Sequence, residues 1–214
     1  INFAHGATLT AAMFAVYVLH GTVGFDPYVA MIVTVPGLFA LGYAVQRLVI
    51  GPASHGDDGN ILLVTLGLAI IIENALLAWF RSDTRSIDVP YGFSVIEVGT
   101  LFLSLPRVIA IGVVLLVALL LWLFLARSTT GQAIRAVAKE KTGAALVGID
   151  VGHIYAVTFG LGAACLAVAA SLLMPTFLVN PRIGNAFVLV AFTIVVLGGM
   201  GSIAGALVGG LFIG

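Results

Sequence analysis

The chain has 214 residues, of which 61% are hydrophobic and only 8% are charged, and its formal net charge at pH 7 is zero. A soluble domain of this size would leave much of that apolar surface in water, and a neutral chain offers no electrostatic footprint for nucleic acid. The composition therefore excludes an ordinary soluble domain, gives no case for a nucleic-acid partner, and predicts a protein embedded in membrane lipid.

The apolar residues form long continuous runs rather than alternating with polar residues, which predicts membrane-spanning helices. We expect an all-α fold, a polytopic transmembrane helical bundle with broken or re-entrant helices, that makes a single domain over residues 1–214. Because the chain begins without Met and ends inside an apolar run, we also expect a fragment that lacks flanking helices at one or both ends. The predicted apolar segments are 6–20, 28–46, 60–80, 107–126, 152–174 and 186–214.

A polar pair, Asn2 and His5, precedes the first apolar segment. That segment is short against the roughly 20 residues that a span needs, and we expect it to begin partway through the membrane. An Asn-x-x-His pair before an abbreviated helix suits a discontinuous element beside a substrate path. A structural histidine bonded to a backbone carbonyl is an equally good interpretation. No second His or Cys lies at ligand spacing, so a metal site is not predicted.

Glu73 and Asn74 lie inside the third apolar segment, about 10 Å of helix from its outer end at about 1.5 Å per residue. An acid at such depth is costly in lipid and usually faces a cavity or a partner. Two interpretations stay open. Glu73 lines a substrate path, where it would meet an ammonium group, or a protonated or hydrogen-bonded Glu73 holds helices together.

Three polar connections separate the apolar segments. Alternation of the spans places 47–59 and 127–153 on one side of the membrane, and 81–106 on the other side together with the turn near Arg182. Lys and Arg residues are divided almost evenly between the two sides, so the positive-inside rule only weakly favours a cytoplasmic 127–153.

The connection 127–153 contains the most informative stretch of the chain. Residues 131–141 combine good helix formers with apolar Ile134, Val137 and Ala138 at helical spacing. The pattern predicts a short amphipathic helix. Such a helix either lies on the membrane surface or docks into a groove on a partner protein, and composition alone leaves both alternatives open.

The last apolar segment, 186–214, is too long for one upright helix, and it contains Gly198, Gly199 and Ser202. Glycine lowers helix stability and serine favours a helix N-cap, so we predict a break at this point. Half-helices that meet at a polar loop inside a membrane protein usually line a cavity. A kink without a transport role is the alternative.

Beyond that break, Gly201, Gly205 and Gly209 recur every four residues. A face of small residues lets two membrane helices approach closely. We therefore predict that these three glycines serve helix packing, either inside this chain or against a partner subunit.

Four stretches, in order along the chain, resemble the permeases of branched-chain (hydrophobic) amino-acid ABC transporters, of the first-permease (LivH-like) type. They are 1–6, 65–68 with the following Glu73 and Asn74, 130–150, and 191–206. The resemblance implies a non-catalytic, membrane-spanning subunit of a binding-protein-dependent importer, multi-pass in a bacterial or archaeal plasma (inner) membrane. It also implies that one helix precedes residue 1 and another follows residue 214.

The resemblance further implies a set of partners: a second homologous permease, two cytoplasmic ATPase subunits, a periplasmic or surface-tethered substrate-binding protein, and membrane lipid. ATP would be bound by the ATPases, and no cofactor is expected in this chain. The sequence agrees, because it contains no Gly-x-x-x-x-Gly-Lys-Ser/Thr.

Two groups of residues follow as candidates from the motifs and the resemblance together. The coupling loop, which would seat on the ATPase, comprises Gly131, Ala133, Ile134, Arg135, Ala136, Val137, Ala138, Glu140 and Ala144. The substrate path comprises Asn2, His5, Thr65, Glu73, Asn74, Gly198, Gly199 and Ser202.

Branched-chain or other hydrophobic amino acids are the first choice of substrate by resemblance, and urea or short amides are the alternative. A rival of another class is an ion-coupled secondary transporter or channel that acts without an ATPase; it would depend on Glu73, the one clear acid deep in a predicted span. A structural membrane scaffold is a third hypothesis. It predicts that polar replacements at Glu73 and His5 leave every activity intact.

Overall fold

The computed structural model describes residues 2–54, 58–98, 101–199 and 201–214; residues 1 and 200, which belong to two of the stretches that resemble the family, lie outside this part. The described part is almost entirely helical, which confirms the predicted all-α membrane fold. Its helices are α1 (Ala4–Val23), α2 (Pro27–Val45), the π-helical turn η1 (Gln46–Ile50), α3 (Gly51–Ser54), α4 (Asp58–Phe80), α5 (Leu105–Arg127), α6 (Thr129–Lys139), α7 (Lys141–Leu146), α8 (Val151–Leu173), α9 (Gly184–Gly198) and α10 (Ile203–Ile213).

Five helical stretches of the described chain are long and apolar enough to cross a membrane: Ala4–Val23, Pro27–Ser54, Gly59–Phe80, Leu105–Arg127 and Val151–Leu173. They coincide with the first five predicted segments. The expectation of a short first segment is wrong, because α1 has 20 residues. The helix includes the polar residues His5 and Thr22 near its two ends. It begins where the Asn2 side chain accepts the Ala4 N–H at 2.9 Å, and it ends at Gly24, whose φ is 76°.

The core lies between α1, α2 and α8, with α1 among the most buried of the spans. Met13, Phe14 and Val16 of α1 are almost fully buried, and Phe14 stacks on Phe80 at the end of α4 with 4.2 Å between ring centroids. Helices α2 and α8 pack closely through small residues, since a Cβ on Gly42 would come within 2.8 Å of Ala163. No residue in the most apolar part of α5 is buried, so α5 lies at the edge of the bundle.

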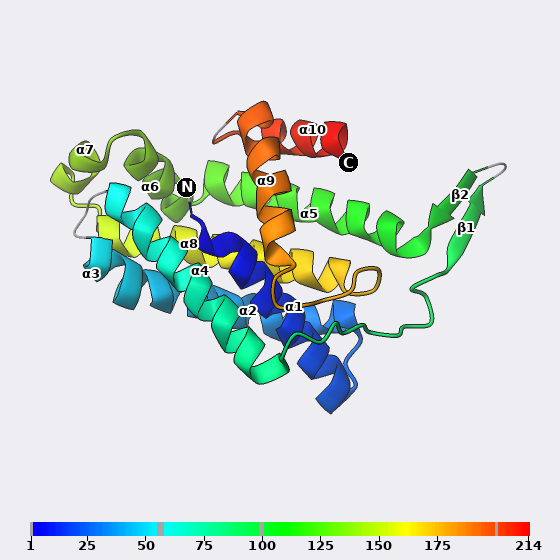
Figure 1. Ribbon diagram of the computed structural model, residues 1–214. Coiled ribbons are helices and arrows are strands. Elements are labelled where there is room, and N and C mark those ends of the chain that lie inside the picture. The colour runs from blue at the N-terminus through cyan, green and yellow to red at the C-terminus, as the bar shows by residue number, and fades with distance from the viewer. Residues whose placement is uncertain (1, 55–57, 99–100, 200) are drawn as a thin grey trace.

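Contacts at the two ends of the bundle support the predicted sidedness of the loops. At one end, Arg47 lies 3.7 Å from Asp150, which brings 47–59 beside 127–153. At the other end, the backbones of Arg85 and Val179 exchange two hydrogen bonds of 2.8 Å. Figure 1 shows α6 and α7 at one end of the molecule and the β1–β2 hairpin at the opposite end.

The predicted break in the last segment is confirmed. Helix α9 ends at Gly198, Gly199 and Gly201 adopt positive φ angles of 85° and 90°, and the Ser202 hydroxyl accepts the Gly205 N–H at 2.9 Å to cap α10. Helix α10 then folds back against α9 (Figure 1). The break forms because glycine adopts left-handed backbone conformations at little cost and serine caps the following helix.

The prediction for the packing glycines is partly right. Gly205 lies against the backbone of Gly198, and a Cβ on Gly209 would come within 3.0 Å of the Ile194 carbonyl, so these two glycines pack within the chain. Gly201 does not pack. Within the described residues nothing lies within 4 Å of its Cβ direction, and its positive φ makes it a turn residue.

One element has no counterpart in the sequence-based prediction. Strands β1 (Val95–Val98) and β2 (Leu101–Ser104) pair antiparallel, with Val95 opposite Ser104. The hairpin leads directly into α5, which begins at Leu105 with Pro106 in its first turn. The strands therefore set where the first turn of α5 lies.

Candidate functional site

A cavity of about 440 Å³ lies between α1, α5, α8 and α9 and has a largely apolar lining. It is called the apolar cavity below. Its ionisable lining residues are His5 and Arg107. The rest of the wall is mostly aliphatic and aromatic, and it includes Leu9, Val114, Leu166, Leu173, Phe187 and Ile194. Such a space suits an apolar group with one or two polar anchors.

His5 is oriented by the residues before α1. Its Nδ1 lies 2.9 Å from the Asn2 carbonyl oxygen, which can only accept, so this bond requires the proton on Nδ1. The structural bond to a backbone carbonyl is thus confirmed. It leaves Nε2 of a neutral ring as an acceptor, and Nε2 faces α8, 3.6 Å from where a Cβ on Gly162 would lie. Asn2 positions His5 and caps Ala4, and it does not line the cavity.

Thr65, a predicted path residue, does not line the apolar cavity. Its side chain is completely buried, with 0% of its surface exposed. Its hydroxyl accepts the Phe3 N–H at 3.3 Å and donates to the Leu62 carbonyl at 3.1 Å. Thr65 therefore ties the start of α1 to α4, which holds the Asn2–His5 motif in place.

Glu73 and Asn74 do not line the apolar cavity. Asn74 is exposed and its amide donates to the Ile70 carbonyl of its own helix at 2.8 Å. Glu73 is half-buried, and among the described residues no hydrogen bond or ion pair reaches its carboxyl group. Helix-to-helix bonding by Glu73 is therefore not seen within the described chain. Both residues lie on α4, where Leu63, Ile70, Ile71 and Trp79 are exposed apolar neighbours.

The path residues at the break also have local roles instead. Gly198 packs against Gly205, Gly199 makes the left-handed turn, and Ser202 caps α10. None of the three lines the apolar cavity. Gly198 instead lines a separate hollow of about 480 Å³ between α9 and α10. The half-helices exist as predicted, but their polar junction is not part of the cavity that His5 faces.

The predicted amphipathic helix of the coupling loop is α6, followed by the short helix α7. Val137 and Ala144 are buried against Ile154 of α8, and Ala133 and Ile134 pack around them. Gly131 lies directly against Phe124 and Leu125 at the end of α5, where a side chain would clash. These residues attach the coupling loop to the bundle: Gly131, Val137 and Ala144 are buried, and Ala133 and Ile134 are half-buried.

Arg135 is also engaged inside the chain. Its guanidinium donates to the Leu125 carbonyl at the C-terminal end of α5, a place where a cation is favoured by the helix dipole. As an ATPase contact it remains a prediction. Among the other predicted coupling residues, Ala136, Ala138 and Glu140 are exposed, and Glu140 caps α7 by accepting the Thr142 N–H at 2.9 Å.

Side-chain contacts also join the ends of α2 and α8 at the point where the coupling loop leads into α8. Asp150 caps α8 by accepting the His153 N–H at 2.9 Å, and Arg47 of η1 lies 3.7 Å away. The His153 N–H, together with the Arg47 charge, lowers the pKa of Asp150. The ring nitrogen Nδ1 of His153 shares a 3.0 Å hydrogen bond with the Tyr43 hydroxyl. The Arg47–Asp150 and Tyr43–His153 contacts join α8 to the end of α2 and its π-helical turn, a feature that is frequent at functional sites.

The whole chain, residues 1–214, matches the sequence model of the family described as branched-chain amino acid transport system, permease component. The chain belongs to this permease family. It is 33% identical over 229 residues to the high-affinity branched-chain amino acid transport system permease protein BraD of Pseudomonas aeruginosa, and the match covers 100% of this chain and 74% of BraD.

Two further relatives of the permease carry the name LivH. The one from Escherichia coli is 31% identical over 233 residues, covering 100% of this chain and 74% of LivH. The one from Methanocaldococcus jannaschii is 25% identical over 221 residues, covering 100% of this chain and 69% of the relative. No solved structure matches the permease. The permease is thus a multi-pass membrane protein and a transport component.

Sequence reasoning missed two features of the permease. Arg107 is not among the predicted path residues, although it lies in the first turn of α5 and lines the apolar cavity. Leu146 and Val147, at the end of α7, are 84% and 77% exposed. An apolar pair next to Gly148 in an otherwise polar and cationic connection is the sequence signal that indicates this exposed position.

Proposed function

We propose that the permease forms half of the path by which an ABC importer carries branched-chain or other hydrophobic amino acids across a bacterial or archaeal inner membrane. The observation that supports this most is the apolar cavity with His5 and Arg107 at its wall, in a chain that belongs to this permease family. Its volume of about 440 Å³ falls within the usual range of ligand pockets, roughly 300–1,000 Å³.

The lining of the cavity favours amino acids over urea. Burial of a branched aliphatic side chain gains roughly 1.5–3 kcal/mol relative to water. Urea and short amides present several N–H groups, and each one costs free energy when it is buried without an acceptor. The wall that includes Leu9, Val114 and Leu166 offers few such acceptors.

The coupling loop would seat on a cytoplasmic ATPase through Leu146 and Val147, with Ala136 and Ala138 beside them. Isolated apolar side chains on a surface are common. Here, however, the pair lies at the end of α7, where Ala144 is buried against α8, and the preceding helix α6 is fixed to α5 and α8 by Gly131 and Val137. A loop that is rigidly joined to two spans can transmit a movement of its partner.

The transport step would use two packings of similar energy that ATP and substrate bias differently. ATP binding would close the two ATPases and move the coupling loop. The Arg47–Asp150 and Tyr43–His153 contacts would pass that movement to the ends of α2 and α8. Hydrolysis by the ATPases would return the permease to its first state, so the chain itself catalyses nothing.

A second, homologous permease would complete the path. Helix α4 is the best candidate for that contact, because its exposed face combines Asn74 with Ile70, Ile71 and Trp79. Glu73, which has no partner within the described residues, would face the second permease or the path between the two. A substrate-binding protein would deliver the amino acid at the end of the bundle opposite α6 and α7.

Co-purification of the complete transporter in mild detergent tests the docking. The variant Leu146→Glu/Val147→Glu places charges on the exposed pair without touching the buried side of the coupling loop. We expect the ATPases to be lost while the second permease is retained. The matched control is Thr142→Glu, which adds a charge to the same short helix at an exposed position, and it should leave the ATPases bound.

Retention of the ATPases by the double variant would contradict docking through this pair. Arg135→Glu is a poorer probe of docking than the double variant, because it would also break the hydrogen bond to the Leu125 carbonyl and disturb the end of α5. If the wild-type permease co-purified with no ATPase and moved leucine along a proton or sodium gradient, the secondary-transporter hypothesis would replace the importer.

A further inference from the structure

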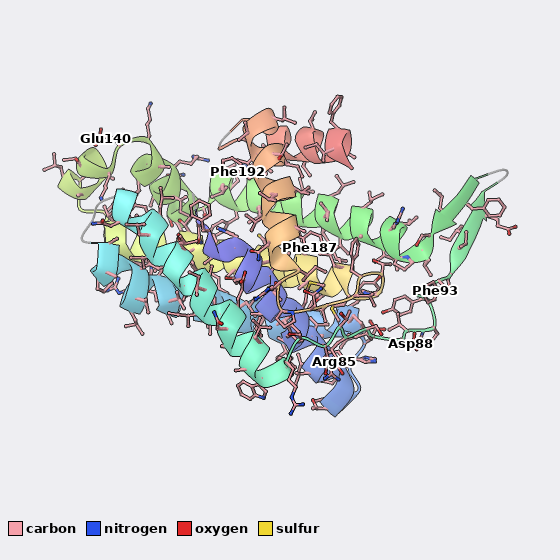
Figure 2. The ribbon with its side chains drawn as sticks, viewed as in Figure 1. Arg85, Asp88, Phe93, Glu140, Phe187 and Phe192 are labelled. Carbon is pink, nitrogen blue, oxygen red and sulfur yellow. The ribbon has the colours of Figure 1, made fainter. Side chains whose placement is uncertain are left out.

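A second cavity, the polar cavity, lies at the end of the bundle opposite the coupling loop. It measures about 460 Å³ and is bounded by the segment 86–95, by Ser104 and Arg107 at the start of α5, and by the turn 174–178 after α8. Its polar side chains include Ser86, Asp88, Ser104 and Arg107. Figure 2 shows Asp88 and Phe93 together on the segment that leads to the hairpin, far from Glu140 of the coupling loop.

The wall of the polar cavity that carries Asp88 is held on both sides. Before it, the backbone of Arg85 exchanges two 2.8 Å hydrogen bonds with Val179, and the Ile87 side chain is buried in the core. After it, the Tyr91 hydroxyl donates to the Asp26 carboxylate at 2.6 Å. A tyrosine hydroxyl is protonated at neutral pH, and burial and this bond raise the pKa of Tyr91 further, so the hydroxyl remains a donor to Asp26. Asp88 is therefore presented from an anchored segment.

The two cavities adjoin. Arg107, Thr176 and Phe177 line both the polar cavity and the apolar cavity. Arg107 thus lies where a space with polar walls meets a space with aliphatic walls. A ligand with a charged end and a branched aliphatic end matches that order of surroundings.

Asp88 and Arg107 are also the opposite charges of the polar cavity, and neither is engaged. Among the described residues no hydrogen bond or ion pair reaches either side chain, and they are not paired with each other. Neighbouring charges differ, since Arg85 is paired with Asp83 at 3.0 Å. Two unpaired opposite charges on one cavity leave a position open for the two ends of a zwitterion.

We propose that Arg107 binds the α-carboxylate and Asp88 the α-ammonium of a free amino acid, whose side chain then points toward the apolar cavity. A guanidinium matches a carboxylate through two parallel hydrogen bonds, and a carboxylate accepts from an ammonium. Both side chains are exposed, so each pair is weak. Weak binding suits an entry site that must pass the amino acid on. The inference rests on the proposed function and names its recognition residues.

The inference separates substrates by their charged ends. Leucine has both the carboxylate and the ammonium. Isovalerate keeps only the carboxylate, and leucinamide keeps only the ammonium. We therefore expect leucine to bind more tightly than either analogue, although all three carry the same branched aliphatic group.

The test uses the complete transporter without its binding protein, because the binding protein would itself govern the uptake KM. Leucine binding is measured by saturation-transfer NMR for wild type, Arg107→Gln and Asp88→Asn. Two exposed charges outside the polar cavity provide matched controls, Arg182→Gln and Glu97→Gln. We expect the Kd for leucine to rise about tenfold or more in the first pair and to change less than twofold in the controls, about tenfold being about 1.4 kcal/mol.

A second readout keeps the outcome clear where folding is in question. Subunit co-purification and thermal unfolding should be unchanged in all four variants, and the maximal rate of leucine uptake with loaded binding protein should fall only for Arg107→Gln and Asp88→Asn. Wild-type transport of leucine with normal binding by both variants would overturn the inference and leave the proposed function standing. A lipid contact would replace the inference if leucine binding were unchanged in Arg107→Gln and anionic lipid raised the thermal stability of wild type but not of this variant.

Discussion

Replacement of Gly6 by Ala should loosen the helix contact on which the apolar cavity depends. Gly6 lies one residue after His5 and faces Gly184, the first residue of α9. A Cβ on Gly6 would come within 2.6 Å of the Gly184 carbonyl oxygen and 2.9 Å of its carbon. Backbone atoms cannot turn aside as a flexible side chain can. The overlap should therefore cost about 1–3 kcal/mol as α1 and α9 move apart.

Gly21 on the same helix provides the matched control. Apart from its own helix, no described atom lies within 4 Å of where its Cβ would be. Alanine in place of a helical glycine gains roughly 0.5–1 kcal/mol from backbone entropy at either site. Gly21→Ala should be neutral or stabilising, whereas Gly6→Ala should be destabilising by up to about 2.5 kcal/mol after that gain.

The assay is thermal unfolding of the purified transporter in detergent, combined with hydrogen exchange of α1 and α9. We expect a lower Tm and faster exchange for Gly6→Ala, with neither change for Gly21→Ala. Equal stability of the two variants would refute the close Gly6–Gly184 contact and with it this description of the cavity wall.

Two further predictions concern the break in the last segment and the coupling loop. Gly205→Leu should lower the Tm, because the new side chain would overlap with Gly198. Gly210→Leu is the control and should leave the Tm unchanged, since no described atom outside its own helix lies within 4 Å of its Cβ position. An unchanged Tm for Gly205→Leu would count against the folded-back α10. Because the pKa of Asp150 is lowered in the folded chain, its contribution should be complete at neutral pH and be lost as the pH falls below the ordinary value of 3.8, and Asp150→Asn should remove that part of the acid sensitivity. Hydrogen exchange at the start of α8 across the acid range measures it, and identical profiles for the two proteins would argue against the cap.

The spans could be predicted because each is a long apolar run, and hydrophobic length is the property that lipid selects. The break at Gly199 could also be predicted, because glycines with positive φ and a capping serine end and begin helices through contacts with neighbouring residues only. The limits of α1 were not, because His5 and Thr22 are polar yet helical. The hairpin was missed because its strands have only four residues each, about the shortest run in which a strand pattern can be recognised.

The candidate site was predictable only in part. His5 was found because its motif is local, and its bond to Asn2 lies within one turn. Arg107 joins the site only because α5, α8 and the segment 86–95 meet in space, and no spacing along the chain reveals that. The contact of Thr65 with Phe3 depends on the packing of α4 against the start of α1, which no pattern along the chain reveals.

Uptake of labelled leucine by proteoliposomes tests whether the permease takes part in ATP-driven amino-acid import. The vesicles contain the permease with its second permease and ATPases, with ATP inside them and loaded binding protein on the face opposite the ATPases. We predict accumulation that requires ATP, stops without the binding protein, and is lost in the Leu146→Glu/Val147→Glu variant. Accumulation without ATP that follows a proton or sodium gradient would contradict the account.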